Sequence, residues 1–375
     1  AFADRFGRLD RNGDGALTRE ELAEARSLTW FSEADSDENG RLSLGEIQAH
    51  FRDRVSPSSK FSGEPLIIEG SLPENAPVTR QGIEAAARYS SKQNGFSFLV
   101  FQDGEVRYER YDQGHGPESA FRLASGTKSF SAAILAAGKR DGFLDLDEKV
   151  SATITEWKGE EGLAEITVRQ LLQLTSGIEP GDNGRVPSYA DAVSVKSVAK
   201  PGSGFRYGPT AFQVFGELVK RKLEAEEQFE SADPLAYLEA RVLEPIGLSY
   251  ENWRRDADGF PHLPSGAFLT ARSWAKYGEL LLAEGLHGGK QILDPDVLRA
   301  CLKGSDANPG YGWTFWLLGE KADKDRPWLA GAYMAAGAGK QRLYVLPQPG
   351  IVVVRQGESR KFEDGHLLDL LFEYE

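Results

Sequence analysis

Three serine–lysine pairs with the spacing Ser-x-x-Lys occur in the 375-residue chain, and this spacing can support nucleophilic catalysis. Residues three apart share one face of a helix, so a neutral lysine amine can take the proton of the serine hydroxyl. A free lysine titrates at about 10.4, so acting as a base near pH 7 requires its pKa to fall by about three units, or roughly 4 kcal/mol. Burial can supply that change, so burial is the property that separates the pairs. They are Ser125/Lys128, Ser197/Lys200 and Ser273/Lys276.

Only Ser125 and Lys128 lead into a run of small and apolar residues, 129–137, that predicts a buried helix. Ser125 would lie at the amino end of this helix, where the helix dipole favours negative charge. The second pair precedes a Pro-Gly-Ser-Gly stretch, which predicts a solvated loop. The third opens an amphipathic helix, in which the serine is more typical of a cap. We therefore predict that Ser125 is a nucleophile and that Lys128 handles its proton.

Two twelve-residue stretches near the start place side-chain oxygens at positions 1, 3, 5 and 12, which is a spacing that wraps ligands around one calcium ion. Gly15 and Gly40 fall at position 6, where the chain must turn sharply. Position 7 supplies only a carbonyl. Leu17 and Leu42, at position 8, are expected to face each other in a short two-stranded contact. The predicted ligands are Asp10, Asn12, Asp14, Ala16 and Glu21, then Asp35, Asp37, Asn39, Arg41 and Glu46.

The two loops and their apolar flanks resemble an EF-hand pair over residues 1–54. The resemblance implies a small all-α domain that binds Ca²⁺. The chain has a single methionine, so a Met-rich target groove is missing and a structural use of calcium is favoured over sensing. Residues 55–65 are rich in serine and proline and predict a linker to a second domain at 66–375.

The net charge of −13 fits a cation-binding chain and disfavours nucleic acid or an anionic membrane as a partner. No apolar run approaches the 18 or so residues that a membrane span needs. The single cysteine, Cys301, is predicted to be a packed helix residue. The chain begins at Ala1, so the lack of a signal peptide decides nothing, and the oligomeric state is not encoded in any visible pattern.

Strands from both ends of the second domain are expected to meet in one sheet. Helical periodicity covers residues 79–92, and a hairpin covers 96–111. Further strands are predicted at 328–334, 340–346 and 350–355, before a final helix from about 364. Residues 140–325 predict a mostly helical lobe, with the active site between the sheet and this lobe.

From about residue 61 onward the chain resembles the serine β-lactamases, the penicillin-binding peptidases, and the hydrolases that share their fold. Family VIII carboxylesterases and 6-aminohexanoate-oligomer hydrolases are the most similar branch. The blocks that carry the resemblance follow the family order and occupy 125–128, 141–150, 167–177, 205–216 and 269–278. The resemblance implies an α+β fold, with a β-lactamase-like antiparallel sheet flanked by helices and a helical lobe, preceded here by the all-α EF-hand domain.

The resemblance also implies roles for individual residues. Tyr207 matches the family tyrosine that shares proton transfer with the lysine, and the backbone N–H groups of Ser125 and Ala338 would form the oxyanion hole. Two departures disfavour β-lactam substrates. Pro209 replaces an asparagine, and Ala335-Ala336-Gly337 replaces the family Lys-Thr-Gly or His-Thr-Gly. Lys340 and Arg342 are nearby cations whose direction the sequence does not give.

The predicted function is hydrolysis through an acyl-enzyme, with a small carboxylic ester as the first choice of substrate. An amide or D-amino-acid peptide comes second and a β-lactam third. A non-catalytic, calcium-dependent binding module is the alternative of another class. No Gly-x-Ser-x-Gly elbow and no metal-binding histidine spacing occurs. Family habit and the calcium loops together favour a periplasmic or secreted location.

Overall fold

The computed structural model describes residues 63–319 and 322–373, together with residues 12, 14–18, 21 and 39–43 near the start. The chain divides into two compact units, Ala1–Gly63 and Glu64–Glu375. The helices predicted for the front unit, and most of the predicted linker, lie outside the described residues. No described helix is both long enough and apolar enough to cross a membrane.

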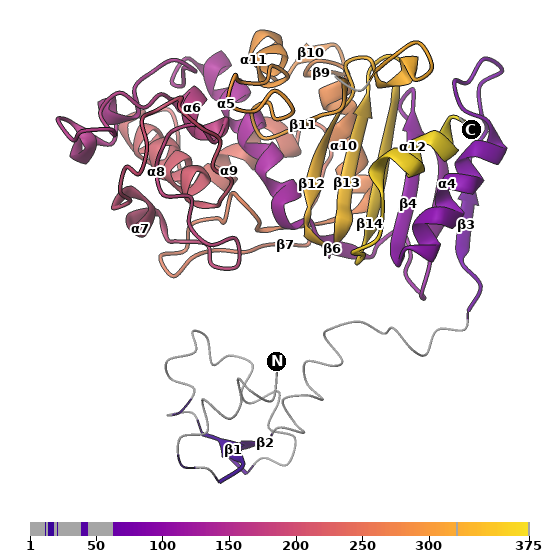
Figure 1. Ribbon diagram of the computed structural model, residues 1–375, viewed down its shortest axis with the longest axis horizontal. Coiled ribbons are helices and arrows are strands. Elements are labelled where there is room, and N and C mark those ends of the chain that lie inside the picture. The colour runs from indigo at the N-terminus through magenta and orange to yellow at the C-terminus, as the bar shows by residue number, and fades with distance from the viewer. Residues whose placement is uncertain are drawn as a thin grey trace. The chain divides into compact units, whose positions relative to one another are not determined.

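A seven-stranded antiparallel sheet forms the centre of the larger unit, in the order β11-β12-β13-β14-β4-β5-β3 (Figure 1). The contact between β14 and β4 joins strands from the two ends of this unit, as predicted. The strand bounds are Leu66–Glu69 for β3, Gly95–Gln102 for β4, Glu105–Tyr111 for β5, Trp316–Leu317 for β11, Tyr333–Gly337 for β12, Gln341–Leu346 for β13 and Ile351–Gly357 for β14.

Within the central sheet, one predicted strand was misplaced and two strands were not predicted. The strand expected at 328–334 begins only at Tyr333, because Pro327–Leu329 form a short 3-10 helix. β3 was missed because its residues do not alternate between buried and exposed positions, and Leu66 and Ile67 are both exposed. β11 has only two residues, which is too short for a period-2 pattern to show.

Helices cover both faces of the sheet. α4 (Arg80–Lys92) and α12 (Asp364–Leu371) pack on one face, and α10 (Ala271–Leu282) packs on the other. α4 buries Ile83, Ala87 and Ser90, which are spaced to share one side of the helix. The cap predicted for Ser273 was wrong, because Thr270 caps α10 by accepting a bond from the Ser273 N–H.

α5 (Ser129–Asp141) lies between the sheet and the lobe, and every residue from Ser129 to Gly138 is buried. The lobe also contains two small sheets, β6-β8-β7 and β10-β9. Its helices are α6 (Val168–Leu172), α7 (Tyr189–Val193), α8 (Thr210–Ala225), α9 (Pro234–Leu238) and α11 (Pro295–Cys301). Its strands are β6 (Ala120–Arg122), β7 (Asn252–Trp253), β8 (Ala267–Thr270), β9 (Leu286–His287) and β10 (Lys290–Gln291).

The described part of the front unit is a short antiparallel pair, β1 (Ala16–Leu17) with β2 (Leu42–Ser43). Leu17 lies opposite Leu42, as their loop positions predicted, and both side chains are buried. Gly15 and Gly40 have φ angles of 80° and 78°, a left-handed conformation that glycine adopts without steric cost.

Candidate active site

Ser125 lies in a 3-10 helix, Ala124–Lys128, between β6 and α5. The α-helix itself begins only at Ser129, so the candidate nucleophile lies on a tight turn just ahead of the helix rather than in its first turn. Ala124 holds a strained φ of 47°. The Thr127 hydroxyl donates to the Ala124 carbonyl over 2.7 Å and accepts from the Ala267 N–H over 3.2 Å, which pins the turn to β8.

Lys128 directs its amine at Ser125, with 3.0 Å between Nζ and Oγ. The amine also donates to the Pro264 carbonyl over 3.2 Å and lies over the rings of Tyr207 and Phe212. The side chain is 2% exposed, and no carboxylate contacts it within the described part of the chain. Burial without a counter-charge lowers the Lys128 pKa to about 7. A large fraction of this amine is therefore neutral near pH 7 and able to accept a proton.

Tyr207 reaches the same point from the segment that precedes α8. Burial raises the pKa of its phenol, and a hydrogen bond with the Ser125 hydroxyl opposes that rise in part. The phenol is therefore protonated at neutral pH and can pass a proton on. The neighbouring Gly208 is required by space, because a Cβ there would lie 2.0 Å from the Pro180 carbonyl oxygen.

The end of β12 lies against the turn Ala124–Lys128, which carries the candidate nucleophile. A Cβ at Gly337 would lie 2.0 Å from the Leu123 carbonyl oxygen and 3.1 Å from the Gly126 nitrogen. Only a glycine permits this approach, and it explains the glycine in Ala335-Ala336-Gly337. Ala338 follows directly and opens the short turn Ala338–Lys340. The arrangement gathers a hydroxyl, a neutral amine, a phenol and backbone N–H groups, which are the groups that acyl transfer needs.

The Beta-lactamase family model matches residues 80–366 of the chain. The chain belongs to the beta-lactamase family. It is a serine hydrolase of the fold shared by β-lactamases and penicillin-binding proteins. An EF hand model matches residues 2–24.

Individual relatives of this beta-lactamase family member are distant. The 6-aminohexanoate-dimer hydrolase of Paenarthrobacter ureafaciens is 24% identical over 335 residues, covering 81% of this chain and 80% of the relative. A family VIII carboxylesterase structure superposes with a TM-score of 0.61 at 14% identity, covering 83% of this chain and all of the other. A penicillin-binding protein homologue from Caulobacter crescentus gives 0.62 at 16%, covering 82% and 99%. The two structural likenesses establish the fold alone.

The two cations near the family's third motif both interact with the Asp364 carboxylate. Arg342 donates to the Asp364 carboxylate through Nε and Nη2, at 2.5 and 3.2 Å. The Lys340 amine lies 3.9 Å from the same carboxylate. Both side chains are therefore held by the acidic residue at the start of α12, and the positive charge of Arg342 also offsets part of the rise that burial causes in the Tyr207 pKa.

An aromatic cluster borders Tyr207 and was not predicted from the sequence. The Tyr207 ring centroid lies 5.9 Å from that of Trp316 and 6.2 Å from that of Tyr311. Phe205 completes the cluster, 5.1 Å from Tyr311. The sequence signal was the aromatic density of residues 311–316, but nothing in their spacing connects them with a tyrosine a hundred residues earlier.

The other two Ser-x-x-Lys pairs do not form a comparable site. The Ser197 hydroxyl donates to the Ala199 carbonyl in a loop, and the Lys276 amine donates to the Gly247 carbonyl. Neither lysine bonds its serine within the described residues.

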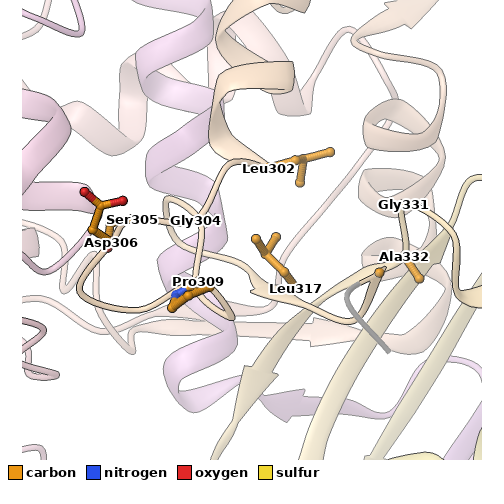
Figure 2. Close-up of a pocket in the computed structure, with 9 residues that line it drawn as sticks. Leu302, Gly304, Ser305, Asp306, Pro309, Leu317, Gly331 and Ala332 are labelled. Atoms are coloured by element: carbon orange, nitrogen blue, oxygen red, sulfur yellow. The ribbon is translucent and has the colours of Figure 1, made fainter. Parts of the chain in front are cut away.

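A hollow of about 490 Å³ lies between the 302–309 loop, β11 and the start of β12 (Figure 2). It is lined by Leu302, Gly304, Ser305, Asp306, Pro309, Leu317, Gly319, Gly331 and Ala332. None of the three candidate catalytic side chains contributes to it, so it is separate from the nucleophile.

Six of the ten predicted calcium ligands belong to the described residues, whereas Asp10, Asp35, Asp37 and Glu46 lie outside them. The Asp14 and Asn39 side chains accept bonds from the N–H groups of the residues two further on, which are the predicted carbonyl donors. The Arg41 guanidinium contacts the Asp14 carboxylate. The described residues alone contain no group of three or more His, Cys, Asp or Glu side chains arranged for a metal. The donors that are described, carboxylate and amide oxygens beside a left-handed glycine, fit calcium chemically.

Proposed function

We propose that this chain is a carboxylesterase that cleaves small esters through an acyl-enzyme on Ser125. One observation carries the proposal. The Lys128 amine, whose pKa burial lowers to about 7, lies 3.0 Å from the Ser125 hydroxyl. A neutral amine at that distance can accept the hydroxyl proton as the oxygen attacks.

In the proposed reaction the Ser125 Oγ attacks the ester carbonyl while Lys128 takes its proton. The negative oxygen that forms is held by the N–H groups of Ser125 and Ala338. The Tyr207 phenol gives its proton to the departing alkoxide and recovers one from Lys128, which leaves an acyl group on Ser125. Water then attacks the acyl-enzyme and gives up a proton to the same amine–phenol pair. The pair passes that proton to the Ser125 oxygen as its bond to the acyl carbon breaks, which releases the acid and restores the hydroxyl.

Two features favour an ester over a β-lactam. The Ala335-Ala336 pair offers no cation for a substrate carboxylate, and Lys340 and Arg342 are directed to Asp364. The aromatic rings around Tyr207 offer an apolar wall for an alkyl or aryl group. Solved structures described as a family VIII carboxylesterase and as a putative β-lactamase both share the fold, so the fold itself favours neither substrate.

An amide is the second candidate, because the curated relative at 24% identity is a 6-aminohexanoate-dimer hydrolase. Ester and amide hydrolysis share the attack step and differ in the leaving group, which is harder to expel from an amide. A panel of p-nitrophenyl esters, a 6-aminohexanoate dimer, a D-Ala-D-Ala peptide and nitrocefin would rank the substrate classes. We expect the largest kcat/KM on short-chain esters.

The direct test uses a fluorophosphonate probe and matched serine variants. Ser125→Ala should lose both labelling and hydrolysis, whereas Ser197→Ala and Ser273→Ala should keep both within about twofold. Hydrolysis that survives in Ser125→Ala would contradict the proposal. A folded wild-type protein that neither labels nor hydrolyses would favour the non-catalytic binding module instead.

We propose in addition that the front unit binds Ca²⁺ through the two predicted loops. Bound calcium would neutralise the carboxylates of each loop, which otherwise repel one another. Isothermal titration of the calcium-free full-length chain should give about two sites, and Asp10→Ala with Asp35→Ala should abolish them. A flat titration of the wild-type chain would overturn this proposal. A periplasmic or secreted location stays a prediction.

A further inference from the structure

Two buried arginines face each other across β13 and β14, next to the turn that carries Ala338. Arg342 and Arg355 are directly opposed in the register of the two strands. Their side chains are 6% and 0% exposed. Such a pair places two like charges in an apolar interior, which is costly unless both are compensated. Backbone carbonyl oxygens supply most of this compensation.

Each guanidinium holds two carbonyl oxygens of the Gly337–Gln341 turn. Arg342 Nη1 donates to the carbonyls of Gly337 and Gln341, at 3.2 and 2.9 Å. Arg355 Nη1 donates to the carbonyls of Gly339 and Lys340, at 2.9 and 2.7 Å. Four of the five carbonyls of this turn are thus bound by two side chains.

Both arginines are themselves fixed from behind. Asp364 binds Arg342 through two bonds, and the Tyr344 hydroxyl donates to the same carboxylate over 2.6 Å. Arg355 has no carboxylate partner in the part of the chain that the structure describes. Its Nη2 donates to the Gln93 carbonyl over 2.8 Å, and its guanidinium lies 4.5 Å from the centroid of the Phe362 ring.

The turn needs this support because its backbone is strained. Gly339 has a φ of 77° and Lys340 a φ of 65°, and the second value is unfavourable for a residue with a side chain. In addition, the Gln341 side chain bonds the Gly357 backbone through both its amide nitrogen, at 2.6 Å, and its oxygen, at 3.3 Å.

The direction of one peptide group connects these contacts with catalysis. In a trans peptide the C=O and the following N–H point in opposite directions, and the chain has no cis peptide bond among its described residues. The Gly337 carbonyl points toward Arg342 on β13. The Ala338 N–H therefore points away from the Arg342 guanidinium, at the place where Gly337 packs against the turn that carries Ser125.

We propose that Arg342 and Arg355 form a clamp that aims the Ala338 N–H at the developing oxyanion. The inference rests on the proposed hydrolase function and adds two positioning residues to it. Neither arginine hydrogen-bonds Ser125, Lys128 or Tyr207 among the described residues. Loosening the turn should therefore weaken binding of the transition state while leaving binding of the substrate almost unchanged.

Arg355→Met is the variant of choice, because it removes one half of the clamp without leaving a carboxylate unpaired. We expect kcat for a p-nitrophenyl ester to fall about ten- to hundredfold with KM within about twofold, since small errors in placement of catalytic groups have effects of this size. The Ki of a boronic acid, which forms a tetrahedral adduct on the serine, should rise by a similar factor. The kcat of Arg355→Lys should lie between those of the wild type and Arg355→Met, because an ammonium cannot reach both carbonyls in the same plane.

Arg272→Met is the matched control. Arg272 also holds a buried partner, the Glu109 carboxylate, through two bonds of 2.6 and 2.7 Å, but it touches no part of the turn. The Arg272→Met substitution should lower the melting temperature. Its kcat, calculated per active site titrated with a fluorophosphonate, should not change.

The clamp is overturned if folded Arg355→Met keeps kcat and the boronate Ki within twofold of the wild type, or if Arg272→Met loses kcat equally. If Arg355→Met does not fold, Arg355→Lys decides, and an unchanged kcat in that variant overturns the clamp. Failure of the proposed function would give a different result, because hydrolysis by the wild type would then persist in Ser125→Ala.

Discussion

Lys128 and Arg342 are both buried cations near the end of β12, yet their surroundings give them opposite chemistry. Lys128 bonds a hydroxyl and a carbonyl and has no carboxylate neighbour among the described residues, so burial lowers its pKa to about 7. Burial also opposes the charge of Arg342, but the hydrogen bonds that it donates to Asp364 and the negative charge of that carboxylate outweigh burial and raise the Arg342 pKa overall. The counter-charge therefore decides whether a buried cation becomes a base or an anchor.

The largest expected effect comes from removing the base. Lys128→Met should lower kcat/KM for esters by about a thousandfold or more, in the upper part of the range for a general base. Lys276→Met, in the Ser-x-x-Lys pair on α10, is the matched control and should stay within about twofold. Equal losses in the two variants would contradict the contrast between them.

The same substitution should stabilise the fold. The folded-state pKa of Lys128 lies below its ordinary value of 10.5, so between pH 7 and 10.5 the unfolded chain binds a proton that the folded chain does not. Stability therefore rises with pH across this window, and the cost of desolvating the charged amine is fully present below it. Lys128→Met lacks this cost, so its melting temperature should exceed that of the wild type by several degrees at pH 6 and by less at pH 9.

Tyr207→Phe should have the second-largest effect, with kcat lowered by about a hundredfold. The ring and its packing against Trp316 are retained, so only the phenolic proton is lost. Tyr237→Phe removes the hydroxyl that bonds Asp141 in the lobe and serves as the control. Full activity in Tyr207→Phe would leave Lys128 as the sole proton carrier and break the proposed relay.

For the buried Arg342–Asp364 pair, Asp364→Asn should lower the free energy of unfolding. It leaves Arg342 buried without its counter-charge, which typically costs about 3–5 kcal/mol. Burial raises the Asp364 pKa, but the hydrogen bonds and the charge of Arg342 outweigh burial and hold this pKa below its ordinary value. The carboxylate therefore stabilises the fold above about pH 4, and this stabilisation is lost as the pH falls through the lowered pKa. Urea unfolding at pH 7 and pH 3 should therefore show a larger difference between wild type and variant at pH 7. A variant as stable as the wild type at pH 7 would remove the anchor role.

Calcium removal should have the smallest effect on hydrolysis. The front unit and the hydrolase unit are separate compact bodies, and the candidate catalytic groups all belong to the second. A chelator should lower the stability of the front unit while kcat/KM stays within about twofold. A large loss of activity that calcium reverses would indicate coupling between the two units.

Local patterns predicted the parts of the site that lie close together in the chain. Ser125 and Lys128 share a turn, so their spacing sufficed to bring them together, and the buried run after them indicated the central helix. Tyr207 and Ala338 were placed only through family motifs, because they lie far from Ser125 in sequence. Trp316 and the Arg342–Arg355 pair were beyond sequence reasoning. Their roles depend on strand register and on the side of a sheet that each side chain occupies, and a two-residue strand or an isolated arginine encodes neither.

The pH dependence of Ser125 modification tests the central claim most directly, because it reports the protonation of Lys128 without a substrate. The second-order rate of fluorophosphonate labelling should rise about tenfold per pH unit below pH 7 and level off above it, and Lys128→Met should abolish this profile. A rate that keeps rising to about pH 10, as for a solvated lysine, would contradict the account.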